Sequence, residues 1–395
     1  MRRTLLALSV ALIALAPAVL RGAEATYEAS IQLERPKSSA DRVEGGPNHV
    51  MLGLWVPDQT GPLRGLLVNP FYLKAIEQEH WRAACRHWKF GIVGANYMRV
   101  HQTEFARTLN AGLEEFATKS GRNELKQAPF LLVGMSAGAG MCIRFAEQLP
   151  ERTLAVAAVC LEVGPETDRT RHVPMLTIFG EKDGRQMPLL LEKLPIRRGE
   201  FDAAWGIAVQ WGRRHEWGAA NNLAMPFFDT VLRQRLSAEG TLTPCDPRQA
   251  WLGDPATWKA QPAQICAAEP PSPERARQCW FPHADVANVW RAFVVPQPQL
   301  RIVSPQSQGD KQPFKVHSSE VELQVEFECT QASDLGLTEV AVFDGARQIA
   351  AAPWTKELRS LSIGKLSAGI HGLWIAGKKG DAIVEISRPA AIVVK

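Results

Sequence analysis

The sequence predicts an α/β fold with a mostly parallel central sheet, followed by a smaller β-sandwich. Between residues 50 and 236, short apolar runs alternate with amphipathic segments, which is typical of a parallel sheet covered by helices on both faces. From residue 300 onward, several short strand-like runs follow one another, as in a sandwich of antiparallel strands. A stretch rich in proline and tryptophan separates these two regions.

The elements of the α/β region follow from the spacing of its apolar residues. Strands are expected at residues 50–56, 65–69, 90–96, 130–134, 154–163, 174–180 and 204–211. Helices are expected at residues 73–88, 104–119, 138–149, 187–194 and 221–236, with Gly121 closing the second of them. We assign residues 26–240 to this domain.

Residues 241–295 break the α/β pattern. They could form a lid, a wrap over the core or a connector, and one helix is expected at residues 284–293. We favour an ordered wrap, because tryptophan side chains are costly to leave in water and this stretch has four of them: Trp251, Trp258, Trp280 and Trp290.

The last hundred residues form the predicted sandwich, which we place at residues 296–395. Strands are expected at residues 300–303, 321–329, 339–343, 358–363, 372–376 and 390–394, with a hairpin turn at Asp344-Gly345. The pattern resembles the immunoglobulin-like modules appended to bacterial secreted enzymes. We interpret the module as a spacer or stabiliser rather than as a sugar-binding site.

Residues 1–25 have the features of a cleaved secretory signal peptide. Arg2 and Arg3 precede an apolar run, and Ala23-Glu24-Ala25 fits the small-x-small rule for signal peptidase. The run is short and contains Pro17, which disfavours a membrane anchor. Since no other apolar stretch approaches bilayer-spanning length, the mature chain is expected in a periplasm or outside the cell.

Composition narrows the partners and the chemistry. A net charge of +4 on 395 residues does not indicate a nucleic-acid-binding protein. Seven cysteines leave at least one thiol unpaired within the chain, and one disulfide is expected among Cys245, Cys266 and Cys279 because little core stabilises that stretch. No cysteine or histidine spacing matches a metal motif, so neither a metal nor another cofactor is predicted.

Ser136 stands in the sequence Gly134-Met-Ser-Ala-Gly138, between an apolar strand and a helix-compatible stretch. This is the pattern of a nucleophile elbow, in which the serine occupies a strained strand-to-helix turn. The two glycines leave room for the strand and helix to pass closely. Ser136 is therefore the candidate nucleophile.

A serine nucleophile requires a base and an acid that orients it. Asp183 lies in the turn after residues 174–180, and His215 follows residues 204–211. Both positions fall at carboxyl ends of predicted parallel strands, where open α/β sheets bind their ligands. We assign Asp183 as the acid and His215 as the base. Glu162, and then Glu181, are the alternative acids.

These motifs resemble those of α/β-hydrolases, over about residues 50–236. Within that fold, the segments 133–141 and 178–184 are similar to secreted esterases grouped with polyester depolymerases, feruloyl esterases and dienelactone hydrolases. The resemblance implies an oxyanion hole made by the backbone N–H groups of Ala137 and of a residue after strand 65–69. Tyr72 is our choice and Phe71 the alternative, although Pro70-Phe71 replaces the family's usual His-Gly.

The resulting hypothesis is a secreted serine hydrolase that cleaves carboxylic esters. Plant polysaccharide, aromatic or polyester substrates would fit export and an appended module. A serine peptidase of the oligopeptidase kind is an alternative, as is a non-catalytic protein that kept the fold. Six aromatic residues close in sequence to the catalytic candidates could line a cleft or pack in the core: Phe71, Tyr72, Trp211, Trp217, Phe227 and Phe228.

Overall fold

The computed structural model describes residues 23–34, 48–98, 100–161, 169–238, 240–246, 249–260, 262–268, 275–305, 315–330 and 335–395. All but the last three residues of the predicted signal peptide lie outside these ranges. No helix in the described ranges is long and apolar enough to cross a membrane.

The central sheet has eight strands in the order β1-β2-β4-β3-β5-β6-β7-β8. Strands β3 to β8 are all parallel, whereas β2 is antiparallel to both β1 and β4. The strands are β1 (Ala25–Gln32), β2 (His49–Val56), β3 (Gly65–Asn69), β4 (Phe90–Ala95), β5 (Phe130–Met135), β6 (Thr153–Val159), β7 (Met175–Gly180) and β8 (Trp205–Gln210).

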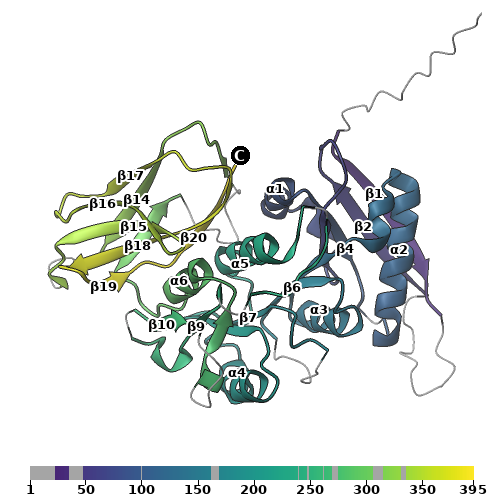
Figure 1. Ribbon diagram of the computed structural model, residues 1–395, viewed down its shortest axis with the longest axis horizontal. Helices are drawn as coiled ribbons and strands as arrows, with labels where there is room; N and C mark the ends of the chain where they lie inside the picture. The colour runs from purple at the N-terminus through teal and green to yellow at the C-terminus, as the bar shows by residue number, and fades with distance from the viewer. Residues whose placement is uncertain are drawn as a thin grey trace, which may run out of the picture.

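Helices cover both faces of this sheet, as Figure 1 shows. Helices α1 and α5 lie on one face, where Trp88 of α1 packs against Phe228 of α5, and α2 and α3 lie on the other. The helices of this region are α1 (Glu79–Trp88), α2 (Phe105–Ser120), α3 (Ala137–Gln148), α4 (Gln186–Pro195) and α5 (Asn221–Arg235). The predicted mostly parallel sheet with helices on both faces is confirmed.

Three details differ from the sequence predictions. The edge strand β1 was not predicted. The predicted helix 73–88 is a 3₁₀ turn (Leu73–Glu77) and α1, separated by Gln78, whose ψ of 108° is extended. The predicted strand 154–163 ends as β6 at Val159, because Cys160 adopts a positive φ of 53° that no strand residue has.

The region after α5 is ordered against the core. It contains a small sheet of β9 (Trp251–Gly253), β10 (Ile265–Ala267) and β11 (Cys279–Phe281), followed by helix α6 (Ala284–Phe293) at the predicted position. Trp258, Trp280 and Trp290 are buried. The predicted disulfide is wrong here, because all three cysteines are free thiols. Cys266 and Cys279 lie on β10 and β11, on opposite sides of β9, about two strand spacings apart.

Two facing sheets form the C-terminal region. One is β12-β14-β17, and the other is β13-β20-β18-β15-β16 with β19 paired to β18. Their inward residues, such as Phe327 and Ile375, share one apolar core. The predicted hairpin is present, with Gly345 at φ 57°. The strands are β12 (Leu300–Ser304), β13 (Val316–His317), β14 (Leu323–Cys329), β15 (Glu339–Asp344), β16 (Arg347–Pro353), β17 (Ser360–Gly364), β18 (Gly369–Lys379), β19 (Ala382–Ile386) and β20 (Ala390–Val394). The likeness to immunoglobulin modules stays a prediction.

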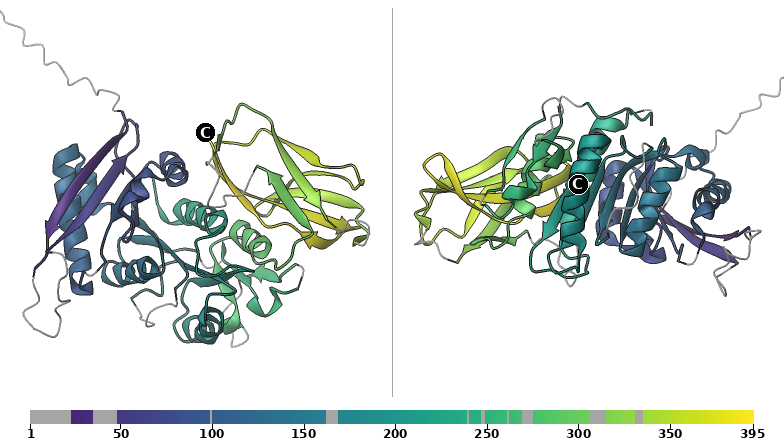
Figure 2. Two further views of the ribbon diagram at one scale, coloured as in Figure 1. Left: turned by 180° about the vertical axis from the view of Figure 1, so that it is seen from behind. Right: turned by 90° about the horizontal axis from the view of Figure 1, so that it is seen from below.

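The larger C-terminal sheet packs directly on α5 and α6 (Figure 2). Gly372 of β18 approaches so closely that an added Cβ would lie 2.6 Å from Val289 Cγ2 of α6. The Asn222 side chain of α5 accepts a hydrogen bond from the Ala391 N–H of β20 at 3.2 Å. Side chains rather than a bare tether therefore join the two regions.

Candidate functional site

Ser136 occupies the sharp turn between β5 and α3. Its φ of 53° and ψ of −124° are a strained conformation for a residue with a side chain. A Cβ on Gly134 would lie 2.6 Å from the Gly138 backbone, so the close passage of strand and helix needs glycine. The Ser136 N–H donates to the Val159 carbonyl at 2.8 Å, which fixes the turn to β6. This geometry is that of the predicted elbow.

Asp183 and His215 meet at the same edge of the sheet as Ser136. Strands β5, β6, β7 and β8 are consecutive neighbours, and the three residues follow β5, β7 and β8. His215 Nδ1 lies 2.9 Å from Asp183 Oδ1. Asp183 is 8% exposed, whereas the His215 side chain is 48% exposed. Among the described residues, His215 forms no hydrogen bond with Ser136, a contact that often tightens only when substrate binds.

Gly180 allows the loop that carries His215 to pack closely against the turn that carries Asp183. An added Cβ there would lie 2.2 Å from the Arg214 carbonyl oxygen and 2.6 Å from that of Arg213. The Lys182 N–H donates to the Arg213 carbonyl at 2.8 Å, which holds the two loops together. This role of Gly180 was not predicted, although a glycine at the end of an apolar strand is a usable signal.

Gln210, the last residue of β8, holds the same loop through side-chain hydrogen bonds. Its side chain is buried, donates to the Trp217 carbonyl at 3.2 Å and accepts from the Ala219 N–H at 2.8 Å. These bonds span both sides of Gly218, where even a Cβ would lie 2.5 Å from the Gln210 amide oxygen. Gln210 is thus a positioning residue for the His215 loop that sequence reasoning missed.

The predicted oxyanion donors lie on two elements beside Ser136. Ala137 is the first residue of α3 and is exposed. The N–H groups of Tyr72 and of the alternative, Phe71, both donate to the Asn69 side-chain oxygen, at 3.0 and 3.2 Å. Phe71 lies against α3, since a Cβ on Gly138 would be 2.7 Å from Phe71 Cβ. Tyr72 as an oxyanion donor stays a prediction, and it would have to release Asn69 to act.

The aromatic candidates separate into core and surface. Trp211, Phe227 and Phe228 are buried, and the Trp211 indole donates to the Val294 carbonyl, so these three pack in the core. Tyr72 is 45% exposed and Phe71 is half-buried. Of the alternative acids, Glu181 accepts from the Gly212 N–H at 2.8 Å rather than pairing with His215. Glu162 lies outside the described residues.

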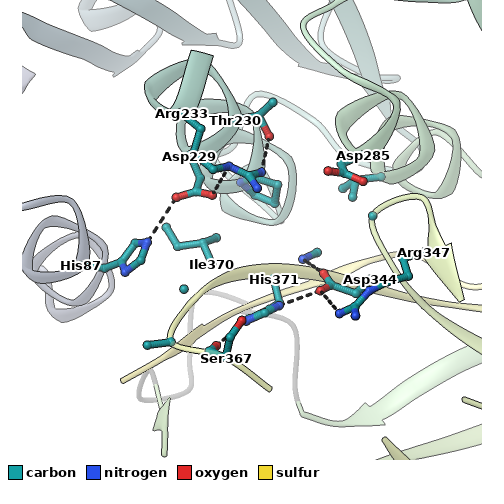
Figure 3. Close-up of a pocket in the computed structure, with 16 residues that line it drawn as sticks. His87, Asp229, Thr230, Arg233, Asp285, Asp344, Arg347, Ser367, Ile370 and His371 are labelled. Atoms are coloured by element: carbon teal, nitrogen blue, oxygen red, sulfur yellow. Dashed lines mark hydrogen bonds and ion pairs between the residues drawn. The ribbon is translucent and has the colours of Figure 1, made fainter. Parts of the chain in front are cut away.

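A cavity of about 420 Å³ lies elsewhere, between α1, α5, α6 and the C-terminal sheet (Figure 3). Asp229 accepts from the Trp88 indole at 3.0 Å and pairs with Arg233 at 3.3 Å. Asp344 pairs with His371 at 2.7 Å. Both carboxylates are thus already engaged in joining elements, and we interpret this cavity as part of the contact between the two regions.

No protein-family model and no curated protein matches the chain. Among solved structures, it is similar to S-formylglutathione hydrolase from Staphylococcus aureus, with 12% identity, a TM-score of 0.36, and coverage of 52% of this chain and 99% of that one. It is also similar to a ferulic acid esterase, with 12% identity, a TM-score of 0.36, and coverage of 53% of this chain and 99% of that one. A third similar structure is a dienelactone hydrolase-like phosphotriesterase from metagenomic libraries, with 12% identity, a TM-score of 0.35, and coverage of 52% of this chain and 89% of that one. All three of these structures are of esterases or related hydrolases.

Proposed function

We propose that the protein is a secreted serine hydrolase that cleaves carboxylic esters through Ser136, His215 and Asp183. The observation that carries the proposal is the 2.9 Å contact between His215 and the buried Asp183 carboxylate, at the sheet edge where Ser136 occupies a strained elbow. A buried carboxylate that orients a solvent-accessible histidine is the arrangement of a general base in a catalytic triad.

In the proposed mechanism, Ser136 Oγ attacks the ester carbonyl while His215 Nε2 accepts the serine proton. Asp183 holds the imidazole with the proton on Nδ1 and stabilises the imidazolium that forms. The Ala137 N–H donates to the oxyanion, together with the Tyr72 N–H once it has exchanged the Asn69 side chain for the substrate. His215 then protonates the leaving alcohol, and water attacks the acyl-enzyme with His215 as the base. The serine is restored without a cofactor.

The surface near Ser136 favours an apolar or aromatic substrate group. Tyr72 and Met98 are large apolar side chains that are 45% and 47% exposed, so their surfaces are open to a ligand. The Tyr97 N–H donates to the Pro70 carbonyl at 3.0 Å, so the segments that carry Met98 and Phe71 lie side by side. Leu161 lies on another side of α3, where a Cβ on Gly140 would be 3.0 Å from Leu161 Cδ2. These side chains support an aromatic or polyester substrate.

Labelling of the purified mature protein with a fluorophosphonate probe tests the proposal, with p-nitrophenyl acetate hydrolysis followed in parallel. We expect the wild type to be labelled and active, and Ser136→Ala to lose both properties. Ser362→Ala removes an exposed hydroxyl on β17 and serves as the matched control. A folded wild type that resists labelling would contradict the proposal and favour a non-catalytic binding protein.

Substrate class is tested by comparing an aromatic ester, methyl ferulate, with an aliphatic ester, methyl acetate, in Tyr72→Ala. This variant removes the exposed ring and keeps the backbone N–H. We expect the KM for the aromatic ester to rise more than that for the acetate. Equal changes for both esters would argue against Tyr72 as a contact for the aromatic group.

A further inference from the structure

Three side chains that can ligate a divalent cation converge at the proposed acid and base. A thiol sulfur of Cys160, a carboxylate oxygen of Asp183 and a ring nitrogen of His215 all lie within 4.8 Å of one another. They come from the ends of three adjacent strands, β6, β7 and β8. Cys160 has a positive φ of 53°, and its N–H donates to the Ile178 carbonyl at 2.7 Å. The thiol therefore occupies a position fixed by the backbone of the sheet.

One ligand atom of this cluster lacks a partner. Asp183 Oδ2 is buried and accepts no hydrogen bond from any described residue. The Cys160 thiol beside it donates to the Glu216 carbonyl at 3.2 Å. A buried carboxylate oxygen without a donor is rare in folded proteins because its desolvation is uncompensated. A bound cation would supply the missing interaction.

We propose that Cys160 Sγ, Asp183 Oδ2 and His215 Nδ1 form a Zn²⁺ site. Sulfur, imidazole nitrogen and carboxylate oxygen are the ligand types that Zn²⁺ takes, and tetrahedral bond lengths place such atoms about 3.3–3.6 Å apart. The three atoms already lie within 4.8 Å of one another, so small side-chain movements would bring them to that spacing. A thiolate and a carboxylate neutralise the ion, and the exposed His215 ring provides the entry path. A fourth position is left for water.

Zn²⁺ binding at this site has a defined proton balance. The Cys160 thiol loses its proton to solvent, while the neutral imidazole keeps one proton, which moves from Nδ1 to Nε2. Asp183 Oδ1 thereby loses its Nδ1–H donor, and the water in the fourth position donates to it instead. One proton is thus released for each ion bound. With a proton on Nε2, His215 cannot accept the proton of Ser136. The site is therefore inhibitory, a consequence that rests on the proposed function, whereas metal binding itself does not.

Zn²⁺ titration against a chromophoric zinc chelator tests the site in metal-free wild type, Cys160→Ser and Cys266→Ser. Serine keeps the volume of the cysteine but removes the soft ligand, and Cys266 is an exposed thiol that serves as the matched control. We expect one Zn²⁺ per wild-type chain and a loss of at least about a hundredfold in affinity in Cys160→Ser, more than an outer-shell change gives. The Cys266→Ser variant should bind as the wild type does.

Co²⁺ provides a test that needs no variant, since a thiolate ligand gives cobalt a near-ultraviolet charge-transfer band. That band should appear with the first equivalent in wild type. Absence of the band, or equal Zn²⁺ affinity in wild type and Cys160→Ser, would overturn the site. Hydrolysis should fall along the same Zn²⁺ titration and return with EDTA. If fluorophosphonate does not label the metal-free protein, the proposed hydrolase function fails. The Zn²⁺ titration and the Co²⁺ band then decide by themselves whether the metal site exists.

Discussion

Gly180→Ala should inactivate the protein while leaving most of its fold intact. The added Cβ would lie 2.2 Å from the Arg214 carbonyl oxygen. Relaxation to an ordinary carbon contact of about 3.5 Å moves the loop by about 1.3 Å. His215 directly follows Arg214, so its 2.9 Å contact with Asp183 would stretch beyond hydrogen-bonding distance. A misplacement of about 1 Å can cost about a hundredfold in rate, which is the loss in kcat/KM that we expect.

The assay is p-nitrophenyl acetate hydrolysis with fluorophosphonate labelling rates, read beside urea unfolding. Overpacking of this kind costs about 1–3 kcal/mol of unfolding free energy, so measurements are made where the variant is folded. Gly53→Ala is the matched control, because its Cβ would meet side-chain atoms alone: the flexible end of Ile76, Cδ1, at 3.0 Å, and Leu73 Cδ1 at an ordinary 3.5 Å. A folded Gly180→Ala whose kcat/KM stays within about threefold of wild type would refute the reasoning.

Three further changes have defined outcomes. Gln210→Leu leaves the Ala219 N–H without its acceptor and removes one of the two donors of the Trp217 carbonyl, which keeps the Ala220 N–H. The kcat should therefore fall, and urea unfolding should show a loss of about 1–3 kcal/mol in unfolding free energy. An unchanged kcat would argue against Gln210 as a positioning residue. Burial alone would lower the pKa of His371, but the hydrogen bond and the charge of Asp344 raise that pKa above its usual value. The pair therefore stabilises the fold fully below the unfolded-state pKa of His371, and this stabilisation is lost as pH rises through the folded-state pKa. His371→Gln should therefore lower the urea midpoint more at about pH 6 than at about pH 9, and an equal drop would exclude the linkage. Arg235→Met leaves three carbonyls without their donor, those of Thr153, Leu154 and Thr243, and should lower the unfolding free energy by about 2–4 kcal/mol in the same assay; a loss under about 0.5 kcal/mol would contradict this role.

Much of the α/β region could be predicted because its strands are buried on both faces. Continuous apolar runs bounded by glycine identify such strands, and a parallel sheet then brings their carboxyl ends to one edge. That logic placed Asp183 and His215 together, and the structure joins them at 2.9 Å. Edge strand β1 was not predicted, because its inward-facing residues alternate with exposed polar ones and form no continuous apolar run. It also lies directly after the predicted signal peptide.

Other features depend on contacts that no local pattern encodes. The Tyr72 N–H is held by Asn69, a side chain that could equally have faced solvent. Cys160 stands in an apolar run, a pattern that by itself predicts only a buried thiol, and the convergence of three strand ends brings it to Asp183 and His215. The expected disulfide failed for a similar reason: cysteines close in sequence were placed on opposite sides of β9 by sheet pairing.

Helix α5 has almost no face of its own toward water, since all of its residues except Arg233 and Gln234 are buried. It closes the central sheet on one side and supports β18 and β20 on the other (Figure 2). Helix α5 packs against the central sheet and against the C-terminal sheet, so a substitution in α5 must fit both packed interfaces. The C-terminal region is therefore not an independent module that could be exchanged between proteins, and an expression boundary at residue 295 would expose apolar surface of α5 and α6.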